Sequence, residues 1–133
     1  MALRYLLDTN TASYVIKGNL PGVRERLSHV PMTDVAISVV TEAELRFGAE
    51  RRPEANQLRM AVEEFLLRVD SRPWDSKSAR QYATLRADLE PEGKPMGNLD
   101  LMIAAQALAE RLVLVTHDRV FDKLKKLRTE DWT

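Results

Sequence analysis

The 133-residue sequence contains no cysteine. Disulfide bonds and thiolate metal ligands are therefore excluded, and so is a small secreted fold that depends on cross-links. The sequence also lacks a run of about 18 apolar residues, the length that a membrane-spanning helix needs. Its first residues form no signal-peptide pattern. We therefore expect a cytoplasmic protein without a membrane association, in which any metal ligands are oxygen or imidazole groups.

A surplus of charge of one sign is missing as well, since 20 basic residues balance 20 acidic ones. A strongly basic total, the simplest sign of nucleic-acid binding, is thus absent. Basic residues do cluster near the C-terminus, at Lys123, Lys125, Lys126 and Arg128, but such clusters are usually solvated faces. The hydrophobic fraction of 44% suffices for a core, and the length predicts one domain, residues 1–133.

Short apolar runs alternate with segments of helical periodicity. Runs at residues 5–7, 35–40 and 112–116 have the character of buried strands, and shorter strands are expected near residue 69 and at 127–132. Helices are expected at about residues 11–17, 21–27, 41–49, 54–67, 76–89 and 101–111. This alternation predicts an α/β fold with a central, mostly parallel β-sheet flanked by α-helices.

Four acidic residues are expected at one edge of that sheet. Asp8 and Asp118 follow central strands, while Glu44 and Asp100 lie in the first turns of helices that begin on the same side. Clustered carboxylates repel one another unless a cation neutralises them, and Mg²⁺ or Mn²⁺ suits oxygen ligands. Such a metal can activate a water for phosphodiester hydrolysis without histidine or cysteine. Neighbouring polar groups are expected to orient waters or carboxylates: Thr9, Asn10, Ser38, Thr41 and Thr116.

Each acid also has a structural explanation. Asp8 and Asp118 are turn-forming residues that could simply end strands. Glu44 and Thr41 fit the T-x-x-E capping box of a helix beginning at Thr41. Asp100 could interact favourably with a helix dipole. The shared position relative to the sheet, rather than any single acid, favours a functional site.

A fifth acid, Glu42, competes with Glu44. Two positions apart on a helix, the two side chains point about 200° apart, so they cannot both face one pocket. Val40, Glu44 and Phe47 share a helix face, which slightly favours Glu44 as the inward acid. Periodicity alone leaves the choice open.

Four ordered segments together resemble the PIN-domain toxins of the VapC family over nearly the whole chain. The resembling segments are residues 5–10, 37–49, 97–105 and 114–118. The first is similar to the family's opening strand and first catalytic acid. In the second, the family's functional acid stands directly before leucine, which selects Glu44 over Glu42. The resemblance implies a single PIN domain.

The resemblance also implies an activity and a set of partners. It implies cleavage of RNA that depends on Mg²⁺ or Mn²⁺, with Asp8, Glu44, Asp100 and Asp118 as catalytic residues and metal ligands. The implied partner is a VapB antitoxin, and the implied assembly is a toxin dimer bound by antitoxins.

Two further features of the sequence refine this resemblance. Residues 22–26 and 127–132 look like the VapC subgroup that cuts initiator transfer RNA in its anticodon region. The family often carries another acid shortly after the fourth one. Here residues 119–122 follow Asp118 and end in Asp122, so this extra ligand is absent or displaced. Asp118 accordingly ranks after the other three acids.

The remaining candidates are interpreted as structural. His29 and His117 each stand alone, and His117 is expected in a surface turn. Trp74 and Trp132 could stack on bases, but anchoring roles are favoured. Lys94, in the loop before residue 97, could contact phosphate. Three methionines are expected to pack in the core or a pocket: Met60, Met96 and Met102.

Other functions remain as alternatives to an endoribonuclease. A phosphatase with an aspartate nucleophile would carry D-x-D-x-T, but Asn10 stands at the second acid. A receiver domain would need paired acids near the start and a late strand-end lysine, and neither is clear. A catalytically silent PIN-like binding module and a Mg-dependent phosphohydrolase stay open.

Overall fold

The computed structural model describes residues 2–52, 54–93 and 96–133. Within them lies one sheet of five strands, all paired in parallel, in the order β3-β2-β1-β4-β5. The strands are β1 (Tyr5–Leu7), β2 (Val35–Ser38), β3 (Asp70–Arg72), β4 (Val113–Val115) and β5 (Thr129–Glu130). The predicted α/β class is confirmed, and the final edge strand is present although shorter than expected.

Helices occupy most of the remaining described chain. The α-helices are α1 (Thr9–Lys17), α2 (Pro21–Leu27), α3 (Val39–Glu50), α4 (Asn56–Arg68), α5 (Ser76–Leu89) and α6 (Asn98–Glu110). Short 3₁₀ helices are η1 (Met32–Asp34), η2 (Glu90–Glu92) and η3 (Arg119–Lys123). Pro53, directly before the helix expected at residues 54–67, lies outside the described residues, and so does Lys94, considered as a phosphate contact. None of the described helices combines the length and apolar character needed to cross a membrane.

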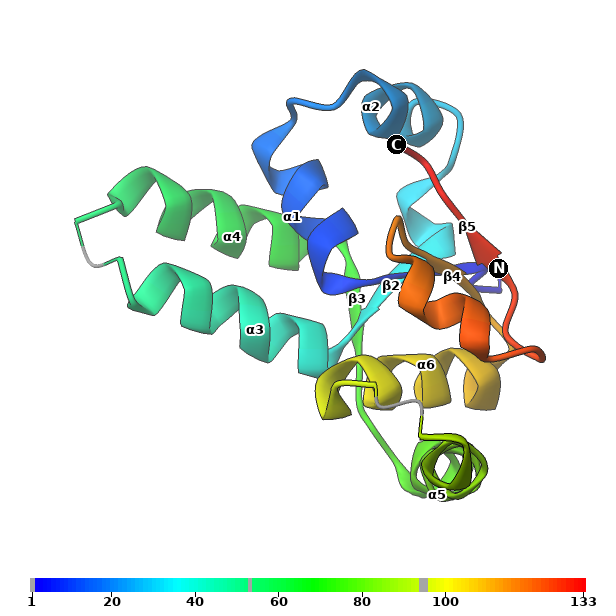
Figure 1. Ribbon diagram of the computed structural model, residues 1–133. Coiled ribbons are helices and arrows are strands. Elements are labelled where there is room, and N and C mark those ends of the chain that lie inside the picture. The colour runs from blue at the N-terminus through cyan, green and yellow to red at the C-terminus, as the bar shows by residue number, and fades with distance from the viewer. Residues whose placement is uncertain (1, 53, 94–95) are drawn as a thin grey trace.

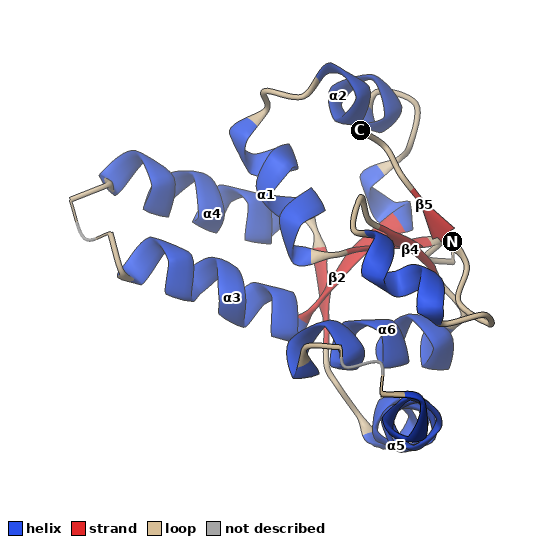
Figure 2. Cartoon of the chain, viewed as in Figure 1, coloured by secondary structure: helices blue, strands red, loops and turns tan. Residues whose placement is uncertain are grey.

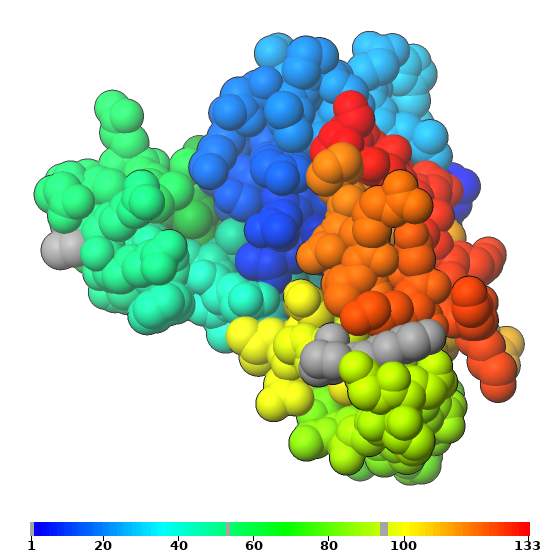
Figure 3. Space-filling view, viewed as in Figure 1, coloured from blue at the N-terminus to red at the C-terminus, as the bar shows by residue number. Residues whose placement is uncertain are grey.

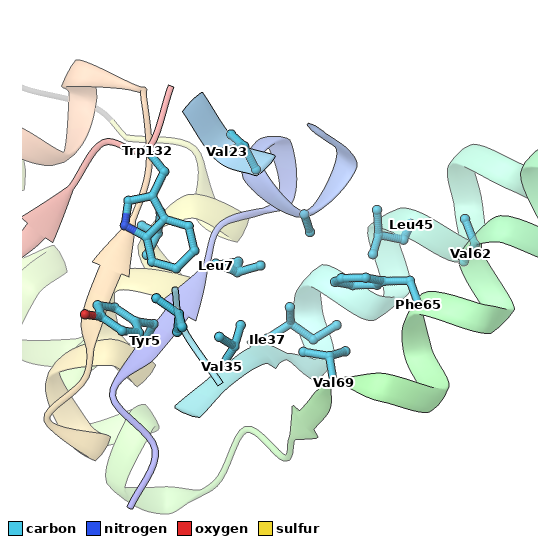
Figure 4. Close-up of a cluster of buried hydrophobic side chains, with 13 residues drawn as sticks. Tyr5, Leu7, Val23, Val35, Ile37, Leu45, Val62, Phe65, Val69 and Trp132 are labelled. Carbon is cyan, nitrogen blue, oxygen red and sulfur yellow. The ribbon is translucent and has the colours of Figure 1, made fainter. Parts of the chain in front are cut away.

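The sheet lies between two layers of helices (Figure 1, Figure 2). Side chains alternate along β1, so that Tyr5 and Leu7 join a cluster with α1, α2 and α4, while Leu6 faces α5, α6 and η3. Figure 4 shows the first cluster, in which Phe65 of α4 lies close to Ile37 of β2. Burying a side chain such as Phe65 contributes about 1.5–3 kcal/mol to folding.

Helices α3 and α4 form an arm that projects from the body of the molecule (Figure 1, Figure 3). Leu45 and Val62, in the middle of the two helices, are buried in the first cluster. Phe47 is 63% exposed and Met60 is 71% exposed. The expectation that Met60 packs in the core is therefore wrong, and Phe47 does not face inward with Glu44. An arm of two helices buries little surface beyond their mutual contact, which leaves its outer apolar side chains in solvent.

The predicted capping box at Thr41 and Glu44 is wrong. Ser38 caps α3, because its Oγ accepts a hydrogen bond from the backbone N–H of Val40 at 3.0 Å. The helix therefore begins directly after Ser38, and the strand expected over residues 35–40 is two residues too long. A polar cap overrides the strand preference of two consecutive valines.

The strand order explains where a ligand can bind. Strands β1 and β4 pair side by side although more than 100 positions separate them in the sequence, as the register of Leu7 with Val115 shows. From β1 the chain proceeds outward to β2 and β3, then returns to the other side of β1. This reversal of order is where ligands bind in open α/β sheets, beyond the carboxyl ends of the strands. Asp8 and Asp118 follow these two strands.

Candidate functional site

Asp8 lies directly after β1 and is only 4% exposed. One carboxylate oxygen accepts the backbone N–H of Thr11 at 2.8 Å, which makes Asp8 the N-cap of α1. The other accepts the hydroxyl of Thr116 at 2.5 Å. The helix start expected at residue 11 is thus two residues too late. A buried carboxylate is tolerated here because it has two donors and lies at the positive end of a helix.

Thr11 is a residue that the sequence reasoning missed. Besides donating its N–H to Asp8, it donates its hydroxyl to the carbonyl of Val115 at 3.1 Å, and so ties the start of α1 to the end of β4. The spacing of three positions between Asp8 and Thr11 is that of an N-cap and its N3 residue, so this signal was present in the sequence.

Glu44 reaches the same edge from α3. The hydroxyl of Thr9 donates to Glu44 Oε1 at 2.5 Å and lies 3.2 Å from the hydroxyl of the buried Thr41. Thr9 is the first residue of α1, next to Asp8. One threonine therefore joins the helix that follows β1 to the helix that follows β2.

Glu42 points elsewhere. Its carboxylate accepts hydrogen bonds from the Ser71 hydroxyl at 2.7 Å and from Arg46 at 2.8 Å. These two bonds, that of Ser71 first, hold the pKa of Glu42 below its usual range. The charge of Glu44, rather than that of Glu42, acts on Asp100. The structure therefore brings Glu44 to the other acids and leaves Glu42 in a network at β3.

Asp100 occupies the first turn of α6 and is half-buried. Burial is the main cause that raises the pKa of its carboxyl group, and the negative charges of Asp118, Glu44 and Asp8 raise it further. Like charges affect one another in this way only when they are near. The other three predicted acids therefore lie near Asp100, at the carboxyl edge of the sheet.

The turn after β4 connects two of the acids through one hydroxyl. Thr116 Oγ1 donates to Asp8 and accepts the backbone N–H of Asp118 at 3.0 Å. Asp118 in turn caps η3 by accepting the N–H of Val120 at 2.9 Å. Its side chain is exposed, so Asp118 is the most solvated of the four acids.

The five polar residues expected to orient the acids divide into two groups. Thr9 and Thr116 bind carboxylates directly, and Thr41 contacts Thr9. Ser38 instead caps α3. Asn10 is exposed and its side chain makes no hydrogen bond to the described residues. The structure thus brings three of the five to the acids by hydrogen bonds.

The acids form a loose cluster rather than a closed cage. Among residues 2–52, 54–93 and 96–133, no three Asp, Glu or His side chains converge closely enough to enclose a metal ion. Four carboxylates with hydroxyl neighbours are nevertheless the donor set of a hard divalent cation. Burial, and after it the charges of the other three acids, raises the pKa of Asp100, and a cation would offset the part due to those charges. Asp122 is not among the acids acting on Asp100, and it pairs with Arg119 at 3.4 Å.

The end of the chain lies next to this edge. The N–H of Thr116 donates to the carbonyl of Glu130 at 2.8 Å, as β5 pairs with β4. Nδ1 of His117, in an exposed turn as predicted, lies 2.8 Å from Asp131 Oδ2. The other oxygen of Asp131 accepts the hydroxyl of Thr133 at 2.6 Å and its N–H at 2.9 Å. These bonds, with the Thr133 hydroxyl first, lower the pKa of Asp131 to about 2.

Trp132 anchors this end of the chain in the core. It is 5% exposed and packs edge-on against Tyr5, with ring centroids 5.1 Å apart (Figure 4). Arg26 of α2 lies over the Trp132 ring at 5.5 Å and pairs with Glu130 at 2.9 Å. The predicted anchoring role of Trp132 is confirmed. The two segments that resemble the RNA-cutting subgroup are therefore in contact with each other.

Comparison with known proteins gives consistent matches along the chain. The family profile of the PIN domain matches residues 5–127. The tRNA(fMet)-specific endonuclease VapC of Shigella flexneri is 36% identical over 132 residues, which cover 98% of this chain and 99% of that protein. The structure of DNA-bound VapBC from Salmonella typhimurium has a TM-score of 0.91 at 35% identity, covering 98% and 99% of the two chains. VapBC2 from Rickettsia felis, bound to a DNA fragment from its promoter, has a TM-score of 0.89 at 31% identity and full coverage of both chains.

These matches confirm the predicted resemblance, and they extend over both the fold and the segments that carry the four acids. The chain belongs to the PIN-domain family and, within it, to the VapC ribonucleases.

Proposed function

We propose that this chain is the endoribonuclease toxin of a VapBC toxin–antitoxin pair and cleaves RNA at the site formed by Asp8, Glu44, Asp100 and Asp118. The observation that carries the proposal is the hydrogen bonding that gathers the acids at the carboxyl edge of the sheet: Thr116 binds Asp8 and the amide of Asp118, and Thr9 binds Glu44. The negative charges of these three acids also raise the pKa of Asp100, after its burial. Relatives that match 98% of the chain are named tRNA(fMet)-specific endonuclease and ribonuclease. Inhibition of translation is the expected consequence of the cleavage.

The acids would hold Mg²⁺ or Mn²⁺. A divalent cation bound there would lower the pKa of a water and stabilise negative charge on the departing oxygen. Without a cation, the four carboxylates would repel an RNA phosphate. The Thr116 hydroxyl binds the carboxylate of Asp8, and the Thr9 hydroxyl binds that of Glu44. Each hydroxyl thus fixes the orientation in which its carboxylate would face the cation.

We further propose initiator transfer RNA as the substrate class and a VapB-type antitoxin as the partner. The Shigella relative is named for tRNA(fMet) cleavage, and the Salmonella and Rickettsia structures are VapBC complexes. The contact between α2 and the C-terminal end supports the subgroup, since both segments resemble it. A homodimer within a larger toxin–antitoxin complex, acting in the cytoplasm, completes the proposal.

The first experiment is cleavage of purified initiator tRNA and of total RNA by the purified chain, with Mg²⁺, with Mn²⁺ and with EDTA. Asp100→Asn is the best variant, because the side chain of Asp100 caps no helix. The substitution removes only a negative charge that the neighbouring acids repel. We expect at least a 100-fold loss of cleavage, since outer partners of a metal ligand alone are worth about 10–100-fold. EDTA should have the same effect.

Asp70→Asn is the matched control. Asp70 begins β3 and therefore lies at the opposite edge of the parallel sheet, where it pairs with Arg72 at 3.6 Å. This variant should cleave like the wild type. Cleavage that survives in Asp100→Asn or in EDTA contradicts the mechanism. Intact RNA together with a stability that responds to chelation would identify a binding module instead.

A further inference from the structure

The turn that carries Asp118 is held from its outer side by the C-terminal segment, which we define as residues 129–133. Three contacts do this. Backbone pairing joins Thr116 to Glu130 at 2.8 Å, and the side chain of Asp131 binds that of His117 at 2.8 Å. The hydroxyl of Thr133 also lies 3.2 Å from Nδ1 of His117. A hollow of about 250 Å³ lies beside these contacts and is lined by His117, Asp118 and Asp131, among others.

The inner side of the same turn bears directly on the acids. The hydroxyl of Thr116 holds Asp8 at 2.5 Å and receives the N–H of Asp118 at 3.0 Å. His117 stands between Thr116 and Asp118 in the sequence, so a rotation of its backbone would move both of these hydrogen bonds. The orientation of two acids therefore depends on where His117 is held.

The C-terminal segment is itself fixed firmly enough to hold His117. Trp132 is buried against Tyr5, and a Cβ atom on Gly22 would lie only 2.6 Å from the Trp132 carbonyl oxygen. The backbone of α2 thus approaches the segment closely. Thr133 donates its hydroxyl and its N–H to Asp131, and these bonds leave Oδ2 of that carboxylate directed at His117.

We infer that Asp131 is a positioning residue for the acid site: through His117 it fixes the turn in which Thr116 and Asp118 bind their partners. The inference deepens the proposed nuclease function and rests on it. The side chains of His117 and Asp131 are 64% and 47% exposed, and pairs so exposed contribute little to folding stability. The contact therefore controls the geometry of the turn more than the stability of the fold.

Asp131→Ala tests this inference, and Asp70→Ala is the control. The side chains of Asp131 and Asp70 are 47% and 48% exposed, and each forms an exposed ion pair. We expect kcat for RNA cleavage to fall about tenfold in Asp131→Ala, with KM and the melting temperature little changed. Asp70→Ala should match the wild type. Asp131→Asn keeps one oxygen acceptor and should recover part of the lost kcat.

A double-mutant comparison separates action through His117 from a general effect. If Asp131 acts through His117, the double variant Asp131→Ala/His117→Ala should be no slower than the slower single variant, because both remove one interaction. Additive losses would overturn the inference. So would an unchanged kcat in Asp131→Ala.

Hydrogen exchange gives a readout that does not depend on catalysis. The amide of Asp118, which binds Thr116, should exchange faster in Asp131→Ala than in the wild type and in Asp70→Ala. If the wild type fails to cleave RNA, the proposed function is wrong, and the exchange rate still decides the positioning role. Equal exchange in all three proteins would overturn it.

Discussion

Replacing Gly22 with alanine should destabilise the protein, although alanine is the better helix former. Gly22 is the second residue of α2, and a Cβ atom there would lie 2.5 Å from the carbonyl oxygen of Thr133 and 2.6 Å from that of Trp132. Both oxygens belong to the backbone, so the C-terminal segment must move. Gly48 offers the opposite case, because a Cβ atom on this residue of α3 meets no atom within 4 Å.

The expected magnitudes follow from two opposing effects. Overpacking of a tight contact costs about 1–3 kcal/mol. Alanine in place of glycine within a helix gains about 0.5–1 kcal/mol. Gly22→Ala should therefore lose about 1 kcal/mol on balance, within a range of about 0–2.5 kcal/mol, and Gly48→Ala should gain about 0.5–1 kcal/mol. For a chain of this size, 1 kcal/mol corresponds to roughly 3–5 °C in melting temperature.

Thermal and urea unfolding of the two variants beside the wild type measures this difference. Gly22→Ala should melt lower and Gly48→Ala higher, with unfolding slopes in urea unchanged. Gly22→Ala should also cleave RNA more slowly, since the displaced segment carries Asp131 away from His117. A Gly22→Ala protein that is stabilised as much as Gly48→Ala would refute the close approach of α2 to the C-terminal segment.

Three further predictions concern the acids and the C-terminal anchor. The pKa of Asp100 is raised in the folded state, so the metal-free protein should lose stability as pH rises through that pKa. Asp100→Asn should therefore raise the melting temperature at neutral pH. An equal gain at acidic pH, where Asp100 is protonated, would contradict this prediction. Thr9→Val removes the hydroxyl bound to Glu44 at 2.5 Å but keeps its shape, so cleavage should fall about tenfold with circular dichroism unchanged. Trp132→Ala should lower the free energy of unfolding, measured in urea, by about 3–5 kcal/mol, while Trp132→Phe should retain most of it. Equal losses in the two variants would argue against the packing of Trp132 on Tyr5.

Local signals were enough to predict most helix and strand positions. Gly18, with a φ of 64°, ends α1 in the left-handed conformation that its sequence position suggests. Asp75, directly before the helix expected at residues 76–89, caps α5 through the N–H groups of Lys77 and Ser78. Caps and stops act within four residues along the chain, so a single sequence contains them in full.

The start of α3 shows where local signals compete. Ser38 and Thr41 are both good caps, and the valines between them favour a strand. Ser38 caps the helix, and the Thr41 side chain instead lies buried beside Thr9 of α1. The contact that buries Thr41 comes from α1, which is distant in the sequence, so residues near position 38 could not decide between the two caps.

The choice between Glu42 and Glu44 has the same origin. The partners that hold Glu42 away from the site, Ser71 chief among them, lie on β3, 29 positions along the chain. Helix periodicity could show that the two acids diverge, but not which direction leads to Asp100. The resemblance selected Glu44, and the arrangement of the two hydrogen-bond networks supplies the physical reason.

The acid cluster itself depends on contacts that are far apart in the sequence. Thr116 binds Asp8 across 108 positions, and no local pattern relates them. What relates them is the strand order: because β4 pairs with β1, the residues that follow both strands must meet at one edge. An α/β pattern with polar residues after each strand therefore predicts the edge at which the acids gather. It also predicts a final edge strand, but not the contact of that segment with the turn after β4, because His117 and Asp131 are 14 positions apart and meet only when β5 pairs with β4.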